Sequence, residues 1–387
     1  MNSINKYILF TLLLFFTIFS YGQTTIWQED FSTYSDGATT AGDNLPDPPG
    51  PPSADGLTDW TISYAGSGNF SIQSNELEAS GMDAIGTWIS QKIDISSYNF
   101  TKVSLDISWI GGVLFDNEDT ILVYYKIDGG SETLFYENYL TEVVDVGSGT
   151  FTTSILSGDT VEIVIKTIND GGGVFYNRFD NISVNEVVEI FSYNGGGNWN
   201  NGNSWSYDDF SAPTRTAAGA APANDQIAII RNNDIITFNI SDEIAGLEIR
   251  NTGTLQWSGT NDLDINQGLV DIESGGNMDR NSNTATLRFI SGIVSNLNNE
   301  GSVSLSNIDF TVDGVILNIT GTSSITLVGD FDFQQDFIEV TNSLSSGTIT
   351  ANRLFFDNDD CSFTNNGTVV INDAIEIIHQ IMMIIIQ

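Results

Sequence analysis

The sequence predicts an all-β protein with two modules in series, a β-sandwich followed by a right-handed parallel β-helix. Residues 24–190 alternate apolar and polar positions in short runs separated by Gly, Asn, Asp and Ser, which is typical of half-buried antiparallel strands. From Gly246 onward, short strand-like segments recur behind glycine at a nearly fixed spacing. Fixed spacing in this range indicates a stack of repeats.

Composition excludes several classes of function. The 387 residues include 50 acidic and 12 basic side chains, for a formal net charge of −38, and the last lysine is Lys166. Nucleic acids and anionic membranes are bound through clustered Lys and Arg, so neither is an expected partner. Hydrophobic residues make up 40% of the chain, which is enough to build folded cores despite the acidity.

The first 22 residues have the pattern of an export signal. A short polar start precedes the apolar run YILFTLLLFFTIF at 7–19, and small residues at 20–22 offer a cleavage site. The run is too short for an ordinary membrane span. We therefore expect a cleaved signal peptide at 1–22, no transmembrane span after cleavage, and a secreted or cell-surface location. The alternative is an uncleaved anchor.

Cysteine and histidine each occur once, as Cys361 and His379. One cysteine forms no internal disulfide, and we expect Cys361 to be a small buried apolar residue. A single histidine excludes most zinc sites and the Ser-His-Asp and Cys-His arrangements of nucleophilic catalysis.

The strands of the first module are expected at its alternating runs. The clearest are KVSLDISWI at 102–110, TILVYYKI at 120–127 and TVEIVIKTI at 160–168. Several such strands between turn residues favour a sandwich over 24–190. The segment 43–56 is rich in proline and is predicted to be a loop, because proline cannot join a central ladder.

Residues 191–223 are the expected junction between the modules. Glycine and asparagine surround Trp199 and Trp205, and small residues follow. Tryptophans in such a segment more often cover the end of a core than bind a ligand, so we predict a cap here.

The second module is predicted over 224–374. GLEI at 246, GLVDI at 268, GIVSNL at 292 and GVILNI at 314 begin 22 to 24 residues apart. A parallel β-helix fits such periods of two or three short strands, and a second antiparallel sandwich is the alternative. The tail at 375–387 is nearly all Ile and Met. We expect the ladder to stop before this tail and the chain to be a truncated fragment.

Three acids of the first module predict a metal site. Glu29 and Asp30 end the first strand after the signal, and Asp180 lies in the last strand, RFDNISV. A sandwich often pairs its first and last strands, which would bring these carboxylates together. Oxygen ligands of this kind suit calcium, so a structural Ca²⁺ held by Glu29, Asp30 and Asp180 is expected. The alternative is that Asp180 and Asn181 cap a turn through local N–H groups.

Five segments of the first module occur together: WQEDF, DWTIS at 59–63, ASGMDAIGTWISQKIDIS at 79–96, TILVYYKIDGG at 120–130 and FDNISV at 179–184. As an ensemble they resemble the jelly-roll modules of secreted Bacteroidetes proteins, which are similar to MAM-like and concanavalin-like anchor modules and to jelly-roll carbohydrate-binding modules. The resemblance covers roughly residues 24–190. It implies a jelly-roll sandwich, a structural calcium between the first and last strands, and a binding or adhesive role.

The junction carries a second resemblance. GNWNNGNSWS followed by APANDQIAII is similar to the entry into the β-helical repeats of large Bacteroidetes surface proteins of the type exported by type IX secretion. That family usually ends in a sorting domain, and none is recognisable in this sequence.

Glycans are the expected ligands, because sugar sites combine an apolar aromatic ring with nearby polar groups. Trp60 follows the proline-rich loop, and Tyr136 and Tyr139 flank a turn, so these three are the predicted ligand contacts. Trp109 and Tyr124 lie in strong strand patterns and are expected to be buried.

The predicted function is a secreted or cell-surface, non-enzymatic protein that mediates adhesion or contacts extracellular polysaccharide or a cell-surface glycan. No catalytic residue is predicted. Asp330 and Asp332 lie two apart on one strand face, which is typical of a solvated face. The alternatives are a carbohydrate-binding module of a truncated polysaccharide-degrading enzyme and a β-helical polysaccharide lyase, although the few scattered arginines after 166 supply a lyase poorly.

Overall fold

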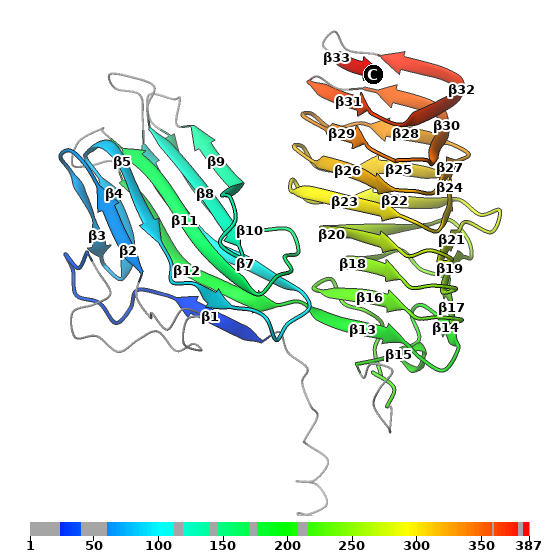
Figure 1. The fold of residues 1–387 in the computed structure, drawn as a ribbon, viewed down its shortest axis with the longest axis horizontal. Coiled ribbons are helices and arrows are strands. Elements are labelled where there is room, and N and C mark those ends of the chain that lie inside the picture. Colours follow the sequence, from blue (N-terminus) through cyan, green and yellow to red (C-terminus); the bar gives the residue numbers. More distant parts are fainter. Residues whose placement is uncertain are drawn as a thin grey trace, which may run out of the picture.

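The computed structural model describes residues 24–39, 60–111, 119–139, 145–169, 176–207, 216–357, 360–377 and 382–386. The predicted signal peptide, the proline-rich loop at 43–56 and His379 lie outside these residues. Two β-rich modules lie side by side (Figure 1). No helix in the described ranges is long and apolar enough to cross a membrane. The predicted all-β architecture, a sandwich followed by a β-helix of about 6 turns, is confirmed.

The sandwich consists of two 6-stranded antiparallel sheets. The first sheet has the order β10 (Asp145–Thr152), β7 (Thr101–Gly111), β12 (Tyr176–Glu186), β4 (Glu76–Ser80) and β3 (Asn69–Gln73), and β1 (Thr25–Glu29) pairs with β12. The second has the order β2 (Thr61–Tyr64), β5 (Met82–Ile89), β11 (Thr160–Asn169), β8 (Thr120–Ile127) and β9 (Thr133–Tyr139), and β6 (Ile93–Asp94) pairs with β11.

Alternation decides which side chains each strand buries. On β7, Val103, Leu105 and Ile107 are buried, whereas Ser104 and Asp106 between them lie on the outer face. Successive side chains of a strand point to opposite faces of its sheet, so the apolar set of each strand enters the space between the two sheets. On β7 the outer face therefore carries the short polar side chains of Ser104 and Asp106.

The first and last strands of the sandwich are neighbours, as expected. β1 pairs antiparallel with β12, and Glu29 lies opposite Ile182. The chain then passes directly from β12 into β13, which begins at Val188 and belongs to the β-helix.

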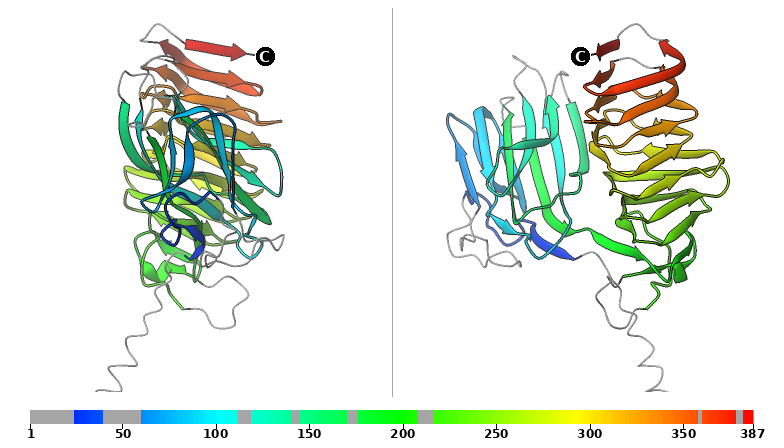
Figure 2. Two further views of the ribbon diagram at one scale, coloured as in Figure 1. Left: turned by 90° about the vertical axis from the view of Figure 1, so that its left-hand side faces the viewer. Right: turned by 45° about the vertical axis from the view of Figure 1, so that its right-hand side comes forward.

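The β-helix stacks short strands into three parallel ladders, which Figure 2 shows from two further sides. Apart from β15, which pairs antiparallel with β13, each strand pairs in parallel with the equivalent strand of a neighbouring coil, so Leu247 lies opposite Val270 and Val270 opposite Leu297. The strands are β13 (Val188–Ser192), β14 (Gly196–Asn198), β15 (Trp205–Ser206), β16 (Gln226–Ile230), β17 (Ile235–Phe238), β18 (Asp242–Ile249), β19 (Thr254–Trp257), β20 (Asn261–Ile272), β21 (Asn277–Asp279), β22 (Ala285–Phe289), β23 (Val294–Asn299), β24 (Ser302–Leu305), β25 (Asn307–Phe310), β26 (Ile316–Gly321), β27 (Ile325–Leu327), β28 (Asp330–Phe333), β29 (Glu339–Asn342), β30 (Thr348–Phe356), β31 (Cys361–Asn365), β32 (Thr368–Ile377) and β33 (Met382–Ile386).

Stacking places like residues above one another inside the β-helix. Phe289, Phe310 and Phe331 form a continuous column, with ring centroids 6.2 and 6.1 Å apart. Asn342 donates from Nδ2 to Oδ1 of Asn365 at 2.6 Å inside the core. The repeat therefore satisfies both apolar and polar interior groups by pairing each with its counterpart one coil away.

Trp199 and Trp205 cover the first coils, as predicted for a cap. Both are fully buried, their rings meet edge to face at 5.1 Å, and Trp205 Nε1 donates to the Trp199 carbonyl at 2.8 Å. The predicted junction is nevertheless part of the β-helix, because β14 pairs in parallel with β17. Cys361 is buried, as expected.

The tail continues the ladder, contrary to the expectation that the repeat stops before 375. β32 extends to Ile377, and β33 pairs in parallel with β31 from Met382 to Ile386. Isoleucine has a high strand propensity, and the preceding coil presents unpaired backbone groups that a further strand satisfies. An Ile-rich sequence therefore extends the ladder even without the glycine spacing.

The modules share a small apolar contact. Val187, Phe191, Ile227, Ile229 and Ala245 form a buried cluster, against which Phe100, Ile155 and Leu269 pack. The backbone N–H of Ile155 also donates to the carbonyl of Gln267 at 3.4 Å. The sandwich is therefore held against one side of the β-helix by this contact as well as by the chain.

Candidate functional site

The predicted calcium ligands do not come together as a set. Glu29 is buried, and its two carboxylate oxygens accept hydrogen bonds from the Phe31 N–H (2.8 Å), the Tyr34 hydroxyl (2.9 Å) and Trp60 Nε1 (3.0 Å). The assignment of Glu29 as a metal ligand is therefore wrong. Successive residues of a strand point to opposite faces, so Glu29 faces the core while Asp30 is exposed.

Asp30 and Asp180 lie close enough to interact electrostatically. Asp30 accepts from the backbone N–H and hydroxyl of Ser32, and Asp180 accepts from the backbone N–H of Asn181 at 2.8 Å. This last bond agrees with the alternative expectation that Asp180 binds a local N–H group. Within the described ranges, no three His, Cys, Asp or Glu side chains form a group that could hold a metal ion.

The three predicted ligand contacts have different surroundings. Trp60 is only 2% exposed and donates to Glu29, so its prediction as a ligand contact is wrong; the buried acceptor draws its indole inward. Tyr136 is half-buried and packs against Phe151, with ring centroids 3.9 Å apart. Tyr139 is 54% exposed at the end of β9, on the opposite face of the strand from Tyr136.

A hollow on the outer face of the first sheet gathers polar side chains from four strands. Its volume is about 270 Å³. It lies across β4, β12, β7 and β10, and the floor is strand backbone, which gives its side chains fixed positions. The lining residues are Glu76, Asp106, Ile107, Ser108, Ser148, Gly149, Thr150, Arg178 and Asp180.

Two carboxylates face each other across this hollow. Asp180 on β12 lies directly opposite Asp106 on β7. Asp106 accepts from the Thr150 hydroxyl at 2.5 Å and from Asn181 Nδ2 at 2.8 Å. Like charges directly opposite in an antiparallel pair are destabilising, so these two donors compensate part of the repulsion.

Asn181 reaches Asp106 because the strand is irregular at this point. The register between β12 and β7 shifts between Asp180 and Ser183, and Asn181 has a left-handed φ of 49°. Asparagine tolerates this region better than most residues. The opening residues of the segment FDNISV thus form a bulge that sets the side chains of the hollow.

Arg178 provides the positive charge of the hollow. Its guanidinium forms ion pairs with Glu78 at 2.7 Å and Glu76 at 3.1 Å. It also lies over the ring of Tyr176, 4.0 Å from the centroid. The hollow therefore combines charge-assisted acceptors with an oriented donor, which together match the hydroxyl groups of a sugar.

Burial and the neighbouring carboxylates raise the pKa of Asp180. Partial burial is the largest cause and raises the pKa of Asp180 to about 6, while the hydrogen bond from Asn181 opposes the shift. The charges of Glu76, Asp30 and Asp106 act in the same direction as burial. Strongly shifted carboxyl groups in a surface hollow are more frequent at functional sites than elsewhere.

Sequence reasoning selected Asp180 but missed Asp106 and Arg178. A usable signal was present, because the alternation in KVSLDISWI places Asp106 on the face opposite the apolar set. That signal cannot show which other strand lies beside β7, so the pairing of Asp106 with Asp180 could not be predicted.

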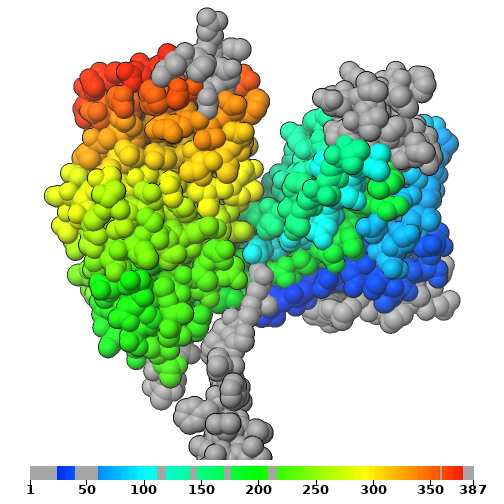
Figure 3. Space-filling view, turned by 180° about the vertical axis from the view of Figure 1, so that it is seen from behind, coloured from blue at the N-terminus to red at the C-terminus, as the bar shows by residue number. Residues whose placement is uncertain are grey.

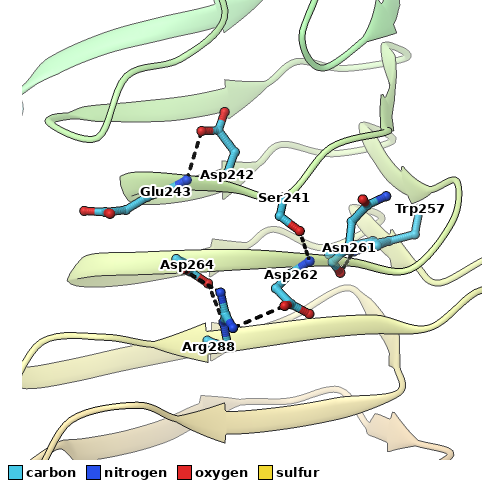
Figure 4. A network of polar contacts seen from close by, with 8 residues as sticks. All are labelled: Ser241, Asp242, Glu243, Trp257, Asn261, Asp262, Asp264 and Arg288. Atoms are coloured by element: carbon cyan, nitrogen blue, oxygen red, sulfur yellow. Dashed lines mark hydrogen bonds and ion pairs between the residues drawn. The ribbon is translucent and has the colours of Figure 1, made fainter.

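A second concentration of carboxylates lies along the β-helix. One outer row follows the ladder register from Glu243 through Asp264, Arg288 and Asp309 to Asp332. Arg288 binds both Asp264 (2.6 Å) and Asp262 (3.2 Å), as Figure 4 shows. Burial is the main cause that raises the pKa of Asp309 to about 7, and the adjacent Asp332 adds to it.

No protein-family model matches this chain, and no curated protein matches it. Solved structures to which this chain shows some similarity include the K3 cleaved adhesin domain of Lys-gingipain from Porphyromonas gingivalis W83, at 14% identity and a TM-score of 0.24, covering 43% of this chain and 99% of that one. The CBM22-1 xylan-binding domain of Paenibacillus barcinonensis Xyn10C is 8% identical, with a TM-score of 0.22, covering 42% and 94%. TmCBM61, solved with β-1,4-galactotriose, is 11% identical, with a TM-score of 0.22, covering 32% and 86%. Likenesses this weak do not assign a function.

Proposed function

We propose that this chain is an exported, non-enzymatic surface protein whose sandwich contacts polysaccharide at the hollow lined by Asp106, Asp180 and Arg178. The observation that carries the proposal is the clustering of fixed, mutually repelling carboxylates on an exposed sheet face. Such an arrangement lowers the stability of the free protein, and carboxyl groups perturbed in this way are more frequent at functional sites than elsewhere. Sugar hydroxyls donate to carboxylates and accept from a guanidinium, so they suit both kinds of group in the hollow.

Export is part of the same proposal. The pattern of residues 1–22 supports it, and the resemblance to Bacteroidetes surface proteins suggests the type IX route. Fractionation of the producing cells with an antibody against the sandwich tests this. Recovery in the medium or at the outer surface supports export, and retention in the cytoplasm contradicts it.

Retention on soluble polysaccharides tests the binding function. Mature chain is run through native gels containing β-1,4-galactan, xylan or laminarin. We expect at least one polysaccharide to retard the protein, and Asp106→Asn to weaken retention about tenfold, because a charge-assisted hydrogen bond contributes about 1.5–3 kcal/mol. Asp373→Asn is the matched control, since Asp373 is exposed on the β-helix. Absence of retardation by every polysaccharide would refute the proposal.

The same samples separate binding from hydrolysis. A pair of carboxylates can cleave a glycosidic bond when the separation suits the mechanism. We expect no new reducing ends after incubation with the retained polysaccharide. Reducing ends that appear with the native chain and disappear with Asp180→Asn would make this chain a glycoside hydrolase.

Calcium is kept as a separate proposal for the sandwich, with Asp30 and Asp180 as the remaining ligands of the predicted set. Melting of the mature chain with calcium and with chelator tests it. Saturation at 100 times the dissociation constant would add about 2.7 kcal/mol to the free energy of unfolding. An unchanged melting temperature would remove calcium from the proposed function.

A further inference from the structure

The modules enclose a groove whose lining differs from that of the hollow on the sandwich except at Thr150, which lines both. Figure 3 shows the two modules in contact side by side, with an open notch between them beyond the contact. Two adjoining cavities of about 440 and 580 Å³ lie between the sandwich edge and the middle coils of the β-helix. They share Phe135, Tyr136, Gly292 and Ile293 in their linings, so they form one continuous groove.

The sandwich wall of this groove is aromatic. β9 and β10 are the edge strands of the two sheets, and the space between the sheets opens toward the β-helix at this edge. Tyr136 from β9 meets Phe151 from β10 at 3.9 Å between ring centroids. Tyr125 and Phe135 lie beside them, 6.1 Å apart. These four aromatic rings lie where the sandwich core ends, and there they line the two cavities.

The β-helix wall is mixed: its apolar part is Ile290, Ile293, Val294 and Ile316, and its uncharged polar part is Asn266, Gln267, Ser291 and Asn296. Asn266 and Gln267 line one cavity and Asn296 lines the other. The oxygens Asn266 Oδ1 and Gln267 Oε1 find no hydrogen-bond donor among the described residues, although both are shielded from solvent. An acceptor in this state costs about 1–3 kcal/mol. A hydroxyl donor reaches either oxygen only if the amide side chain turns toward the cavity that the same residue lines.

Charge decides which class of ligand fits. Glu137 and Glu243 are the charged residues in the two linings, and the described lining residues include no Lys, Arg or His. The whole chain carries a formal charge of −38. A uronate or sulfate group would therefore enter the groove against like charge, without a cation to meet it.

We propose that this groove is a second glycan site, which binds an uncharged polysaccharide strand between the modules. Tyr136 and Phe151 provide the apolar surface for the sugar rings, and Asn266, Gln267 and Asn296 bind the hydroxyl groups. The inference rests on the proposed function, since it assumes a polysaccharide partner. It adds to the proposed function a second binding site, in the groove between the modules, and the expectation that the polysaccharide is uncharged.

Titration of the full chain with soluble polysaccharides tests the groove. The probes are laminarin and β-1,4-galactan, which are uncharged, and alginate and polygalacturonate, which are polyanionic. We expect an uncharged probe to bind and both polyanions to fail. Tyr136→Ala and Gln267→Ala should each weaken binding about tenfold, which corresponds to 1.4 kcal/mol.

Two control variants keep the result interpretable. Tyr64→Ala removes a 41% exposed aromatic side chain of β2, at the opposite edge of the sheet that contains β9, and it should leave binding unchanged. Because Tyr136 is half-buried, Gln267→Ala on the β-helix wall tests the same groove without truncating the sandwich. Melting curves of each variant report whether the fold is intact.

The outcomes separate this inference from the proposed function. Binding that is lost with Asp106→Asn and unaffected by Tyr136→Ala and Gln267→Ala overturns the groove and leaves the proposed function standing. Equal binding of alginate overturns the charge class. If none of the four probes binds, the groove fails, and the proposed function fails with it if xylan also does not retard the protein.

Discussion

The sandwich and the β-helix reach similar burial through opposite arrangements of the chain. In the sandwich, Glu29 of the first strand pairs with Ile182 of the last, so the core closes only when the whole module is in place. In the β-helix, Leu247 pairs with Val270 and Val270 with Leu297, so each coil needs only its neighbours. Long-range contacts make one module a single cooperative unit, while near-neighbour contacts let the other lose stability locally.

The same contrast governs their carboxylates. Asp106 and Asp180 meet because two distant strands pair in antiparallel order, and Asn181 and Thr150 supply donors to that pair. Asp309 and Asp332 meet because the repeat puts equivalent positions above each other. Neither Asp309 Oδ1 nor Asp332 Oδ1 has a hydrogen-bond partner among the described residues. Strict stacking therefore places carboxylates of successive coils against one another. In the sandwich, the irregular strand supplies a hydrogen-bond donor that offsets part of the same repulsion.

The largest expected effect tests cooperativity. Phe179→Ala in the sandwich and Phe331→Ala in the β-helix each remove a fully buried ring and should each cost about 4 kcal/mol of unfolding free energy. Hydrogen exchange should accelerate across the whole sandwich for Phe179→Ala, but only in the coils next to β28 for Phe331→Ala. Phe337→Ala is the control, because Phe337 is 58% exposed. If Phe331→Ala accelerated hydrogen exchange equally in all coils of the β-helix, the proposed difference in cooperativity between the two modules would be wrong.

A smaller effect is expected from the buried acceptor of the sandwich. Glu29→Ala removes the carboxylate that accepts from Trp60 Nε1, the Tyr34 hydroxyl and the Phe31 N–H, which should cost about 3 kcal/mol. Urea unfolding followed by tryptophan fluorescence measures this loss. Asp30→Ala, at the exposed neighbouring position, should cost less than about 1 kcal/mol. Equal losses for the two variants would contradict the structural role of Glu29.

The smallest effects compare the two carboxylate pairs by pH. The folded pKa of Asp309 is about 7 and that of Asp180 about 6, both above the unfolded value of about 3.9. The native state binds each proton more tightly, so stability falls as pH rises from about 4 toward each folded pKa and is lowest above it. Asp309→Asn should therefore stabilise the β-helix by about 2 kcal/mol at pH 8, and Asp180→Asn the sandwich by about 1 kcal/mol after solvent screening.

Thermal unfolding at pH 4 and pH 8 measures both gains. Each gain should shrink at pH 4, where the native carboxyl group is already protonated. Asp373→Asn removes the same charge from an exposed position and controls for the change in net charge. A gain that is the same at both pH values, or that Asp373→Asn reproduces, would show that burial and pairing are not its cause.

Local pattern determined much of this protein in advance. Alternation predicted the strands of the sandwich and put Val103, Leu105 and Ile107 in its core, because strand side chains alternate faces wherever the strand is paired. The glycine spacing predicted the β-helix, since a coil of fixed length returns each residue above its counterpart. Both signals act over a few residues or one repeat, so they can be read without knowing the fold.

Only the tertiary structure decided which distant side chains meet. Asn181 binds Asp106 from 75 positions away, and nothing in either segment specifies that β12 lies beside β7. Trp60 resembled a surface aromatic until Glu29 proved to be a buried acceptor for its indole. The groove depends on the docking of two modules around Ile155. Contacts of this kind follow from strand order and module packing, which many sequences with the same alternation would satisfy in different ways.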